Sequence, residues 1–126
     1  MPMPFVQPRR RWLLLVCSAA ALVLMVAPAL AHQRRPPPSR GDTMKVRVVA
    51  YAGHQPTYTG AKTRHGICAT DPAVIPLGTR FFVPGYGVCR AADIGGGIRG
   101  TMVDVWVAKE RTAIRWGVKH LTITFR

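Results

Sequence analysis

Acidic residues are scarce in this sequence. Its 126 residues include five Asp and Glu against 18 Lys and Arg, which gives a formal net charge of +13. Such an imbalance implies an anionic partner surface, which would be nucleic acid inside a cell. Outside a cell, the candidate anionic partners are peptidoglycan, teichoic acid and lipid headgroups. The basic residues form no band on one element, so solubility and loose wall retention account for most of them.

Charge is absent altogether from residues 12–31, which follow the three arginines Arg9 to Arg11. The stretch is almost wholly apolar and ends in Ala29-Leu30-Ala31, with small residues where a signal peptidase cuts. This pattern predicts a secretory signal peptide over residues 1–31 and a protein exported to the periplasm, cell wall or extracellular space. The alternative is an uncleaved N-terminus that associates with the membrane, because 20 apolar residues just span a bilayer. Cleavage after Ala31 leaves 15 basic and five acidic residues, a net charge of +10.

Cysteine is also rare, and no paired CxxC spacing occurs, which argues against a zinc site built from His65, Cys68 and Cys89. In an oxidising compartment the two cysteines of the exported part, Cys68 and Cys89, are instead expected to form a disulfide. It would close a loop of about 20 residues and contribute roughly 3 kcal/mol. A domain this small benefits from such a link, because its core is limited.

The exported part divides into a linker and one domain. Residues 32–43 contain three consecutive prolines and no apolar periodicity, which predicts a stiff Pro/Arg-rich linker before a domain over residues 44–126. One short helix is predicted at Lys109–Trp116, with Gly117 as its stop. Strands are predicted at Lys45–Tyr51, Ile67–Thr70, Arg80–Val83, Gly87–Ala92, Thr101–Val107 and His120–Phe125. No internal repeat interrupts this pattern, which is typical of a mainly β fold, a small closed barrel, expected to be monomeric.

Three of the five acids are candidates for chemistry: Asp71, Asp93 and Asp104 each lie at or within an apolar strand. Asp42 falls in the linker, and Glu110 opens the helix, where a negative charge suits the dipole. Strand alternation places Asp104 on one face with Met102 and Trp106. A carboxyl group walled by these side chains is partly desolvated, which raises its pKa toward the range of a general acid. The alternative is a surface acid on a solvated strand face.

Asp93 precedes a glycine-rich segment, residues 95–100. Its alternative role is to cap a turn, but glycines also let the backbone approach a ligand, so Gly95 and Gly96 are candidates to bind sugar hydroxyls. The segment formally matches GxGxxG. Too little chain follows for a βαβ unit, which excludes a dinucleotide site. Asp71 precedes Pro72 and, taken alone, is a turn former.

Aromatic residues are candidates to stack on sugar rings, although most aromatics in so small a domain belong to the core. Trp116 is assigned to the core, as the apolar anchor of the helix. No Ser-His-Asp or Cys-His constellation is apparent, and the histidines have no obvious partners. The stacking candidates besides Trp116 are Tyr51, Tyr58, Tyr86 and Trp106.

Five ordered motifs resemble those of the three-aspartate, or 3D, domain family. They are ATDPAVIPLGT at 69–79, VPGYG at 83–87, ADIGGGIRG at 92–100, VDV at 103–105 and WG at 116–117. The resemblance spans about Val46 to Phe125. It implies a six-stranded double-psi β-barrel, similar to the catalytic barrel of membrane-bound lytic transglycosylase A. Ile94 departs from the Thr or Val that is usual after the second aspartate.

The resemblance also implies an activity, cleavage of the MurNAc–GlcNAc β-1,4 bond of peptidoglycan glycan strands to give 1,6-anhydroMurNAc ends. Asp104 would be the single acid/base, Asp93 and Asp71 would position substrate or tune it, and no metal or cofactor would be needed. A non-catalytic, expansin-like wall-binding module and a hydrolase of β-1,4 glycans are the alternatives. A nucleic-acid partner is disfavoured by the export signal. The expected substrate contacts are Lys62, Thr63, Tyr86, Gly95, Gly96 and Trp106.

Overall fold

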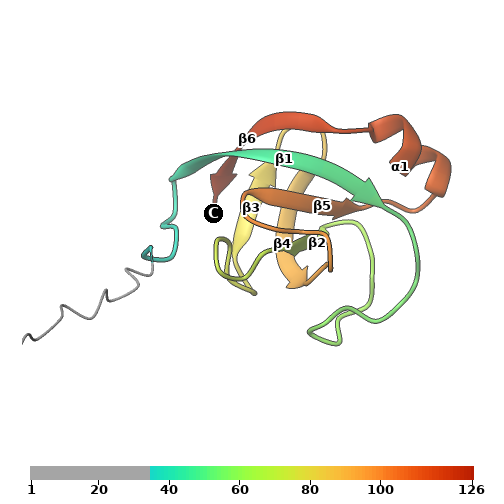
Figure 1. The fold of residues 1–126 in the computed structure, drawn as a ribbon, viewed down its shortest axis with the longest axis horizontal. Coiled ribbons are helices and arrows are strands. Elements are labelled where there is room, and N and C mark those ends of the chain that lie inside the picture. The colour runs from blue at the N-terminus through green and yellow to red at the C-terminus, as the bar shows by residue number, and fades with distance from the viewer. Residues whose placement is uncertain (1–34) are drawn as a thin grey trace, which may run out of the picture. The chain divides into compact units, whose positions relative to one another are not determined.

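The computed structural model describes residues 35–126, which form a closed six-stranded β-barrel with one short helix (Figure 1). The predicted mainly β fold is confirmed, and some element ends differ from the predicted ranges by one or two residues. The predicted signal peptide lies outside the described residues. Within the described part of the chain, no helix has the length and apolarity needed to cross a membrane. The elements are β1 (Thr43–Tyr51), β2 (Ile67–Thr70), β3 (Arg80–Val83), β4 (Gly87–Asp93), β5 (Met102–Trp106), α1 (Glu110–Trp116) and β6 (Lys119–Phe125).

The order of strands around the barrel is β1-β5-β2-β4-β3-β6. Two pairs are parallel, β1 with β5 and β2 with β4, and the remaining pairs are antiparallel. As a result β1 and β2, which are consecutive in the chain, run antiparallel on either side of β5. In the same way β4 and β5 run antiparallel on either side of β2. These two interlocked loops make the barrel double-psi, as the sequence motifs predict.

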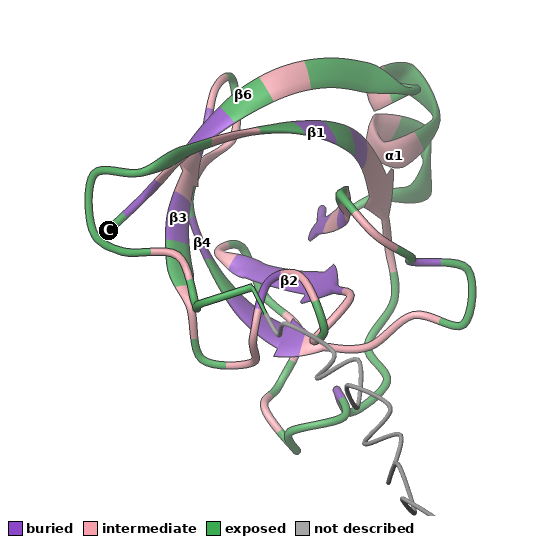
Figure 2. Cartoon of the chain, turned by 60° about the vertical axis from the view of Figure 1, so that its left-hand side comes forward, coloured by how far each residue is buried: buried purple, intermediate pink, exposed green. Residues whose placement is uncertain are grey.

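Alternating apolar residues fill the barrel. Val46 and Val48 of β1 and Val103 and Val105 of β5 point inward and are at most 3% exposed. Burying each such side chain contributes roughly 1.5–3 kcal/mol relative to leaving it in water. β2 is buried along its whole length (Figure 2). The core also contains Ile75, Phe81, Val83, Ala91, Ile123 and Phe125.

The predicted disulfide is present between Cys68 of β2 and Cys89 of β4, whose Cα atoms are 6.0 Å apart. Both cysteines are completely buried in the core. The bond therefore links the parallel β2–β4 pair from inside the barrel. It also leaves neither sulfur free for the zinc site considered as an alternative.

α1 is a short helix that connects β5 to β6 (Figure 1). It ends as predicted at Gly117, whose φ of 65° is in the left-handed region that favours glycine and whose N–H donates to Ala113 O. Trp116 packs against the core and meets the Tyr86 ring edge-on, with ring centroids 6.2 Å apart. The assignment of Trp116 as the anchor of the helix is thus confirmed.

The end of the predicted linker is attached to β6. Gly41 N–H donates to Phe125 O, and Phe125 N–H donates to Asp42 O. The Asp42 carboxylate in turn accepts a hydrogen bond from Ser39 N–H at 2.8 Å and so closes the turn that leads into β1. Asp42 therefore has a local structural role at the start of the barrel.

Candidate active site

A β-bulge next to Asp93 decides which way this side chain points. Cys89 and Ala91 point into the core, so simple alternation would also direct Asp93 inward. The register between β2 and β4 shifts between Cys68, which pairs with Ala91, and Ala69, which pairs with Asp93. Ala92 is the extra residue. The bulge therefore turns the carboxylate to the outside of the barrel instead of burying it among apolar side chains.

The bulge also brings two of the three candidate aspartates onto one rung of the sheet. Ala69 of β2 pairs with Asp93 on one side and with Asp104 on the other. Neighbouring residues on one rung point to the same face, so both carboxyl groups stand outside the barrel with a methyl group between them. Two strand spacings separate the aspartate Cα atoms by about 10 Å. Residues that are 11 positions apart in the sequence thus form a pair.

The long loop between β1 and β2 borders these aspartates and is held at its base and near its middle. Trp106 Nε1 donates to Gly53 O at 2.6 Å, and Thr63 Oγ1 donates to the same carbonyl at 3.0 Å. Near the middle of the loop, Thr59 donates to the carbonyl of the bulged Ala92 through both N–H and Oγ1. The loop thereby satisfies the carbonyl that the bulge leaves unpaired.

Between this loop and the barrel lies an open cavity of about 550 Å³. Asp93, Asp104 and Tyr51 supply its side-chain acids and hydroxyl, and Ile94 and Ala69 supply apolar surface. The remaining lining residues come from the β1–β2 loop and the glycine-rich segment; they are Ala52, Gly53, His54, Gln55, Pro56, Thr63 and Gly95.

Asp104 has the protonation behaviour of a general acid. Burial, and then the nearby negative charge of Asp93, raise the pKa of its carboxyl group from 3.8 to about 6. Its Oδ1 atom is buried and has no hydrogen-bond partner among the described residues. As predicted, Asp104 lies on the strand face opposite to Val103 and Val105; the two valines are buried in the core and Asp104 faces outward. A carboxyl group in this state can donate a proton near neutral pH.

Asp93 is held differently. Its Oδ1 accepts hydrogen bonds from the backbone N–H groups of Tyr58 and Ile94, both at 2.9 Å. Because the Ile94 contact is a backbone one, it does not require the hydroxyl that a Thr would bring to this position. Asp93 therefore provides a fixed negative charge beside Asp104.

Tyr51 is the residue of this site that sequence reasoning treated only as a stacking candidate. Its hydroxyl is buried and lies near Asp93 without meeting the geometry of a hydrogen bond. Burial, followed by the charges of Asp93 and Asp104, raises its pKa, so the hydroxyl stays protonated and can donate. A buried polar group that is unpaired inside a cavity is suited to a ligand. Its place in the site follows from the β1–β5 register, because Val49, two residues before Tyr51, pairs with Asp104; no sequence pattern reports this pairing.

Asp71 is not among the residues that line this cavity. Its two oxygens accept hydrogen bonds from Gly100 N–H at 2.8 Å and Ala73 N–H at 3.0 Å. These bonds, the Gly100 one first, lower the pKa of Asp71. Asp71 thus ties the turn after β2 to the end of the glycine-rich segment.

The other predicted contact residues occupy different places. Thr63 and Gly95 line the aspartate cavity, whereas Lys62 lines a neighbouring hollow of the β1–β2 loop together with Thr63. Gly96 is exposed beside Gly95. Trp106 is 8% exposed and anchors the loop through its indole N–H.

Tyr86 also lies away from the aspartates. Its hydroxyl accepts a hydrogen bond from Gly66 N–H and donates one to Trp106 O at 2.7 Å. Its ring stacks on His65, with centroids 4.4 Å apart. Within residues 35–126, no three His, Cys, Asp or Glu side chains gather in a way that suits a metal ion.

The fold and the cavity define the class: a small double-psi barrel domain that carries paired carboxyl groups on its outer face. The family model of the 3D domain matches residues 67–125, so this part of the chain is a 3D domain. The resemblance that the motifs predict is confirmed for these residues, which include all three aspartates.

Two proteins of Bacillus subtilis (strain 168) are similar to the chain. The cell wall-binding protein YocH is 47% identical over 57 residues, which cover 45% of this chain and 20% of YocH. The "Putative cell wall shaping protein YabE" is 38% identical over 94 residues, which cover 68% of this chain and 23% of that protein. The chain therefore spans about a fifth of the length of these curated relatives.

Proposed function

We propose that the protein is an exported lytic transglycosylase that cleaves the MurNAc–GlcNAc β-1,4 bond of peptidoglycan. The printed names of the two relatives support action at the cell wall. The observation that carries the enzymatic proposal is the cavity in which Asp104, with its pKa raised to about 6, stands beside Asp93. The proposal includes the signal peptide at residues 1–31, the linker at 32–43 and the catalytic domain at 44–126.

In the proposed reaction Asp104 donates its proton to the glycosidic oxygen as the bond from that oxygen to C1 of MurNAc breaks. The Asp104 carboxylate then accepts the proton of the MurNAc C6 hydroxyl, whose oxygen forms a bond to C1. The product has a 1,6-anhydroMurNAc end, and Asp104 is again protonated. No water is consumed, which distinguishes the reaction from that of glycosidases with two catalytic carboxyl groups.

The neighbouring groups have supporting roles in this proposal. Asp93, fixed by two backbone N–H groups, supplies negative charge that keeps Asp104 protonated and stabilises positive charge developing at C1. Tyr51 donates its hydroxyl hydrogen to a substrate oxygen. Thr63 and Gly95 contact the sugar, and Lys62 contacts it from the adjacent hollow. Asp71 is a positioning residue, because it holds the segment that follows Asp93.

The experiment is to incubate purified protein with peptidoglycan and to identify the released muropeptides by mass spectrometry. We expect products lighter by one water than those of a hydrolase. Asp104→Asn should abolish release while the fold persists. Exposed Asp42, which lies outside the cavity, gives the matched control, and Asp42→Asn should retain activity. An active Asp104→Asn protein would refute the assignment.

A wall-binding module without catalysis is the second candidate, because one relative is named a cell wall-binding protein. It predicts that the protein sediments with insoluble peptidoglycan and releases nothing. Products with ordinary reducing ends would instead identify a hydrolase.

A further inference from the structure

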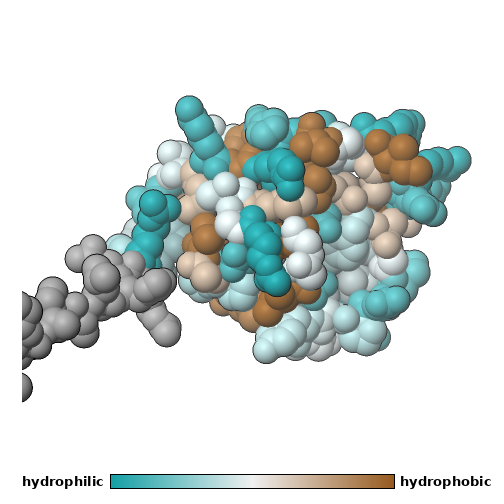
Figure 3. All heavy atoms as spheres, viewed as in Figure 1, coloured by the Kyte–Doolittle hydropathy of each residue, from teal (hydrophilic) through white to brown (hydrophobic). Residues whose placement is uncertain are grey.

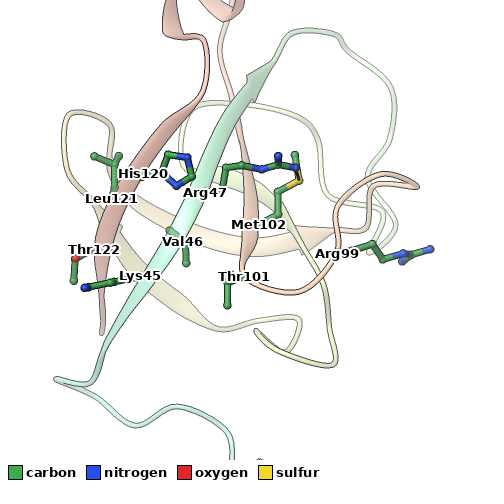
Figure 4. A pocket seen from close by; sticks show the side chains of 9 residues that line it. All are labelled: Lys45, Val46, Arg47, Arg99, Thr101, Met102, His120, Leu121 and Thr122. Atoms are coloured by element: carbon green, nitrogen blue, oxygen red, sulfur yellow. Dashed lines mark hydrogen bonds between the residues drawn. The ribbon is translucent and has the colours of Figure 1, made fainter.

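A second hollow, the basic pocket, lies on the outside of the barrel where β6, β1 and β5 run side by side (Figure 4). Its volume is about 520 Å³. Four of its side chains are basic or can become so, and none is acidic. The lining residues are Lys45, Val46, Arg47, Arg99, Thr101, Met102, His120, Leu121 and Thr122.

Strand pairing arranges these side chains. Lys45 pairs with Thr122 and Arg47 pairs with His120 across β1 and β6, and all four are exposed. The Arg47 side chain extends to Met102, where a guanidinium N–H meets the sulfur at 3.1 Å (Figure 4). The cations and the Thr hydroxyls therefore form an array of donors on the barrel surface. Hydrophilic groups separate the apolar ones on the face seen in Figure 3, so no broad apolar surface competes for a ligand there.

The basic pocket adjoins the aspartate cavity along two paths. On the first, Arg47 pairs with Met102 and Val49 pairs with Asp104, so the two sites occupy successive outward rungs of β1 and β5. These rungs are about 7 Å apart. The second path is the glycine-rich segment, which begins at Gly95 in the aspartate cavity and carries Arg99 in the basic pocket. One extended polymer can therefore contact both sites.

We propose that the basic pocket binds the free carboxylates of the peptide stems carried by the glycan strand that lies across Asp104. This inference rests on the proposed function, because it takes the strand at the aspartates as given. The site is open and has two cations on β1, Lys45 and Arg47, and a third, Arg99, on the glycine-rich segment. Separate cations of this kind suit several anions spaced along one polymer. The stems are attached to that polymer, so their carboxylates arrive with the glycan.

The test measures binding to stem-bearing glycan strands and to the same strands whose stem carboxylates have been converted to neutral carboxamides. Every protein carries Asp104→Asn, so binding is measured without cleavage. Lys45→Gln/Arg47→Gln should weaken binding of stem-bearing strands about fivefold, since exposed ion pairs contribute little each. Binding of the amidated strands should change by less than about twofold. Lys45→Arg/Arg47→Lys, which keeps both charges, should preserve affinity for both ligands.

A second basic cluster provides the control. Arg80 and Arg90 are exposed cross-strand neighbours on β3 and β4, and they line a hollow that does not include the aspartates. Arg80→Gln/Arg90→Gln removes the same charge and should leave stem-bearing binding unchanged. Thermal denaturation checks that each variant folds.

Four outcomes would overturn the inference. The first three are an unchanged affinity of the Lys45→Gln/Arg47→Gln protein for stem-bearing strands, equal weakening for both kinds of strand, and an equal effect of the Arg80→Gln/Arg90→Gln control. The fourth comes from the same measurement with teichoic acid as the ligand: the Lys45→Gln/Arg47→Gln protein binds teichoic acid more weakly but binds the glycan strands as before. The last outcome would assign the basic pocket to a phosphodiester polymer. Failure of the proposed function would look different, because it appears as missing anhydro products in the muropeptide assay while the binding comparison still gives an answer.

Discussion

Replacing Asp104 by Asn should stabilise the fold at pH 8 while removing activity. The pKa of this carboxyl group is about 6 in the folded protein, against 3.8 for an unperturbed Asp side chain. Two units correspond to about 3 kcal/mol, and because the side chain is only partly buried, solvent screening reduces this to roughly 1–2 kcal/mol. Asn has nearly the same size and no charge, so it avoids the cost of ionising this buried position.

The size of this stability difference depends on pH. Below pH 3.8 Asp104 is protonated in the folded and unfolded states alike, and the variant should match the wild type in charge. As pH rises from 3.8 to 6, the unfolded state ionises first, which lowers the stability of the wild type. The advantage of the variant should therefore grow across this range and be complete above about pH 6.

Urea denaturation followed by tryptophan fluorescence at pH 4 and pH 8 measures this difference. At pH 8 the melting temperature of the Asp104→Asn protein should be about 5–10 °C higher than that of the wild type for a domain of this size. Asp71→Asn is a control for which the opposite change is expected, a loss of stability at pH 8. Hydrogen bonds from Gly100 and Ala73 lower the pKa of Asp71, so its charge stabilises the fold above pH 3.8 and this contribution is lost in acid. A less stable Asp104→Asn protein at pH 8, or a gain of equal size at both pH values, would refute the reasoning.

Four further outcomes follow from the same contacts. Wall cleavage, measured as muropeptide release, should fall about tenfold per pH unit above pH 6, because Asp104 must be protonated; a rate still rising at pH 8 would contradict this. Cys68→Ala/Cys89→Ala should lose roughly 3 kcal/mol in urea denaturation, whereas two free thiols in exported protein would show that the bond does not form. Tyr86→Phe removes hydrogen bonds to Gly66 and Trp106 and should lower the free energy of unfolding by about 1–3 kcal/mol; an unchanged melting temperature would contradict this. Gly95→Ala would place a Cβ 2.5 Å from Ile98 Cγ1 and should lower the melting temperature, while Gly96→Ala, with open space around it, should not; equal effects would exclude the clash.

Local patterning predicted most of the fold. Short apolar runs bounded by Gly and Pro turn residues, with alternation in the first and last, located all six strands, and Gly117 located the end of the helix. The pairing of Cys68 with Cys89 followed from their number and from the expected compartment. The order of strands around the barrel does not follow from alternation, because it depends on contacts between distant segments; the family resemblance implied only the double-psi architecture.

The candidate site was less predictable. Alternation correctly placed Asp104 on the face opposite to Val103 and Val105, but it would place Asp93 inside the core. An acid directed into an apolar core is itself the signal that an extra residue, here Ala92, must intervene. The hydrogen bonds of Asp71 and the burial of Tyr51 arise from the packing of loops, and no periodicity in the sequence reports on them.

The place of β6 in the barrel has a consequence for biosynthesis. β1 is bordered by β5 and β6, so the first strand of the barrel waits for the last two before either of its edges is covered. Pairing that depends on such distant segments is slow, and a shortened chain lacking β6 would leave the edges of both β1 and β3 open to other molecules. The barrel can therefore close only after β6, its last strand, has been synthesised.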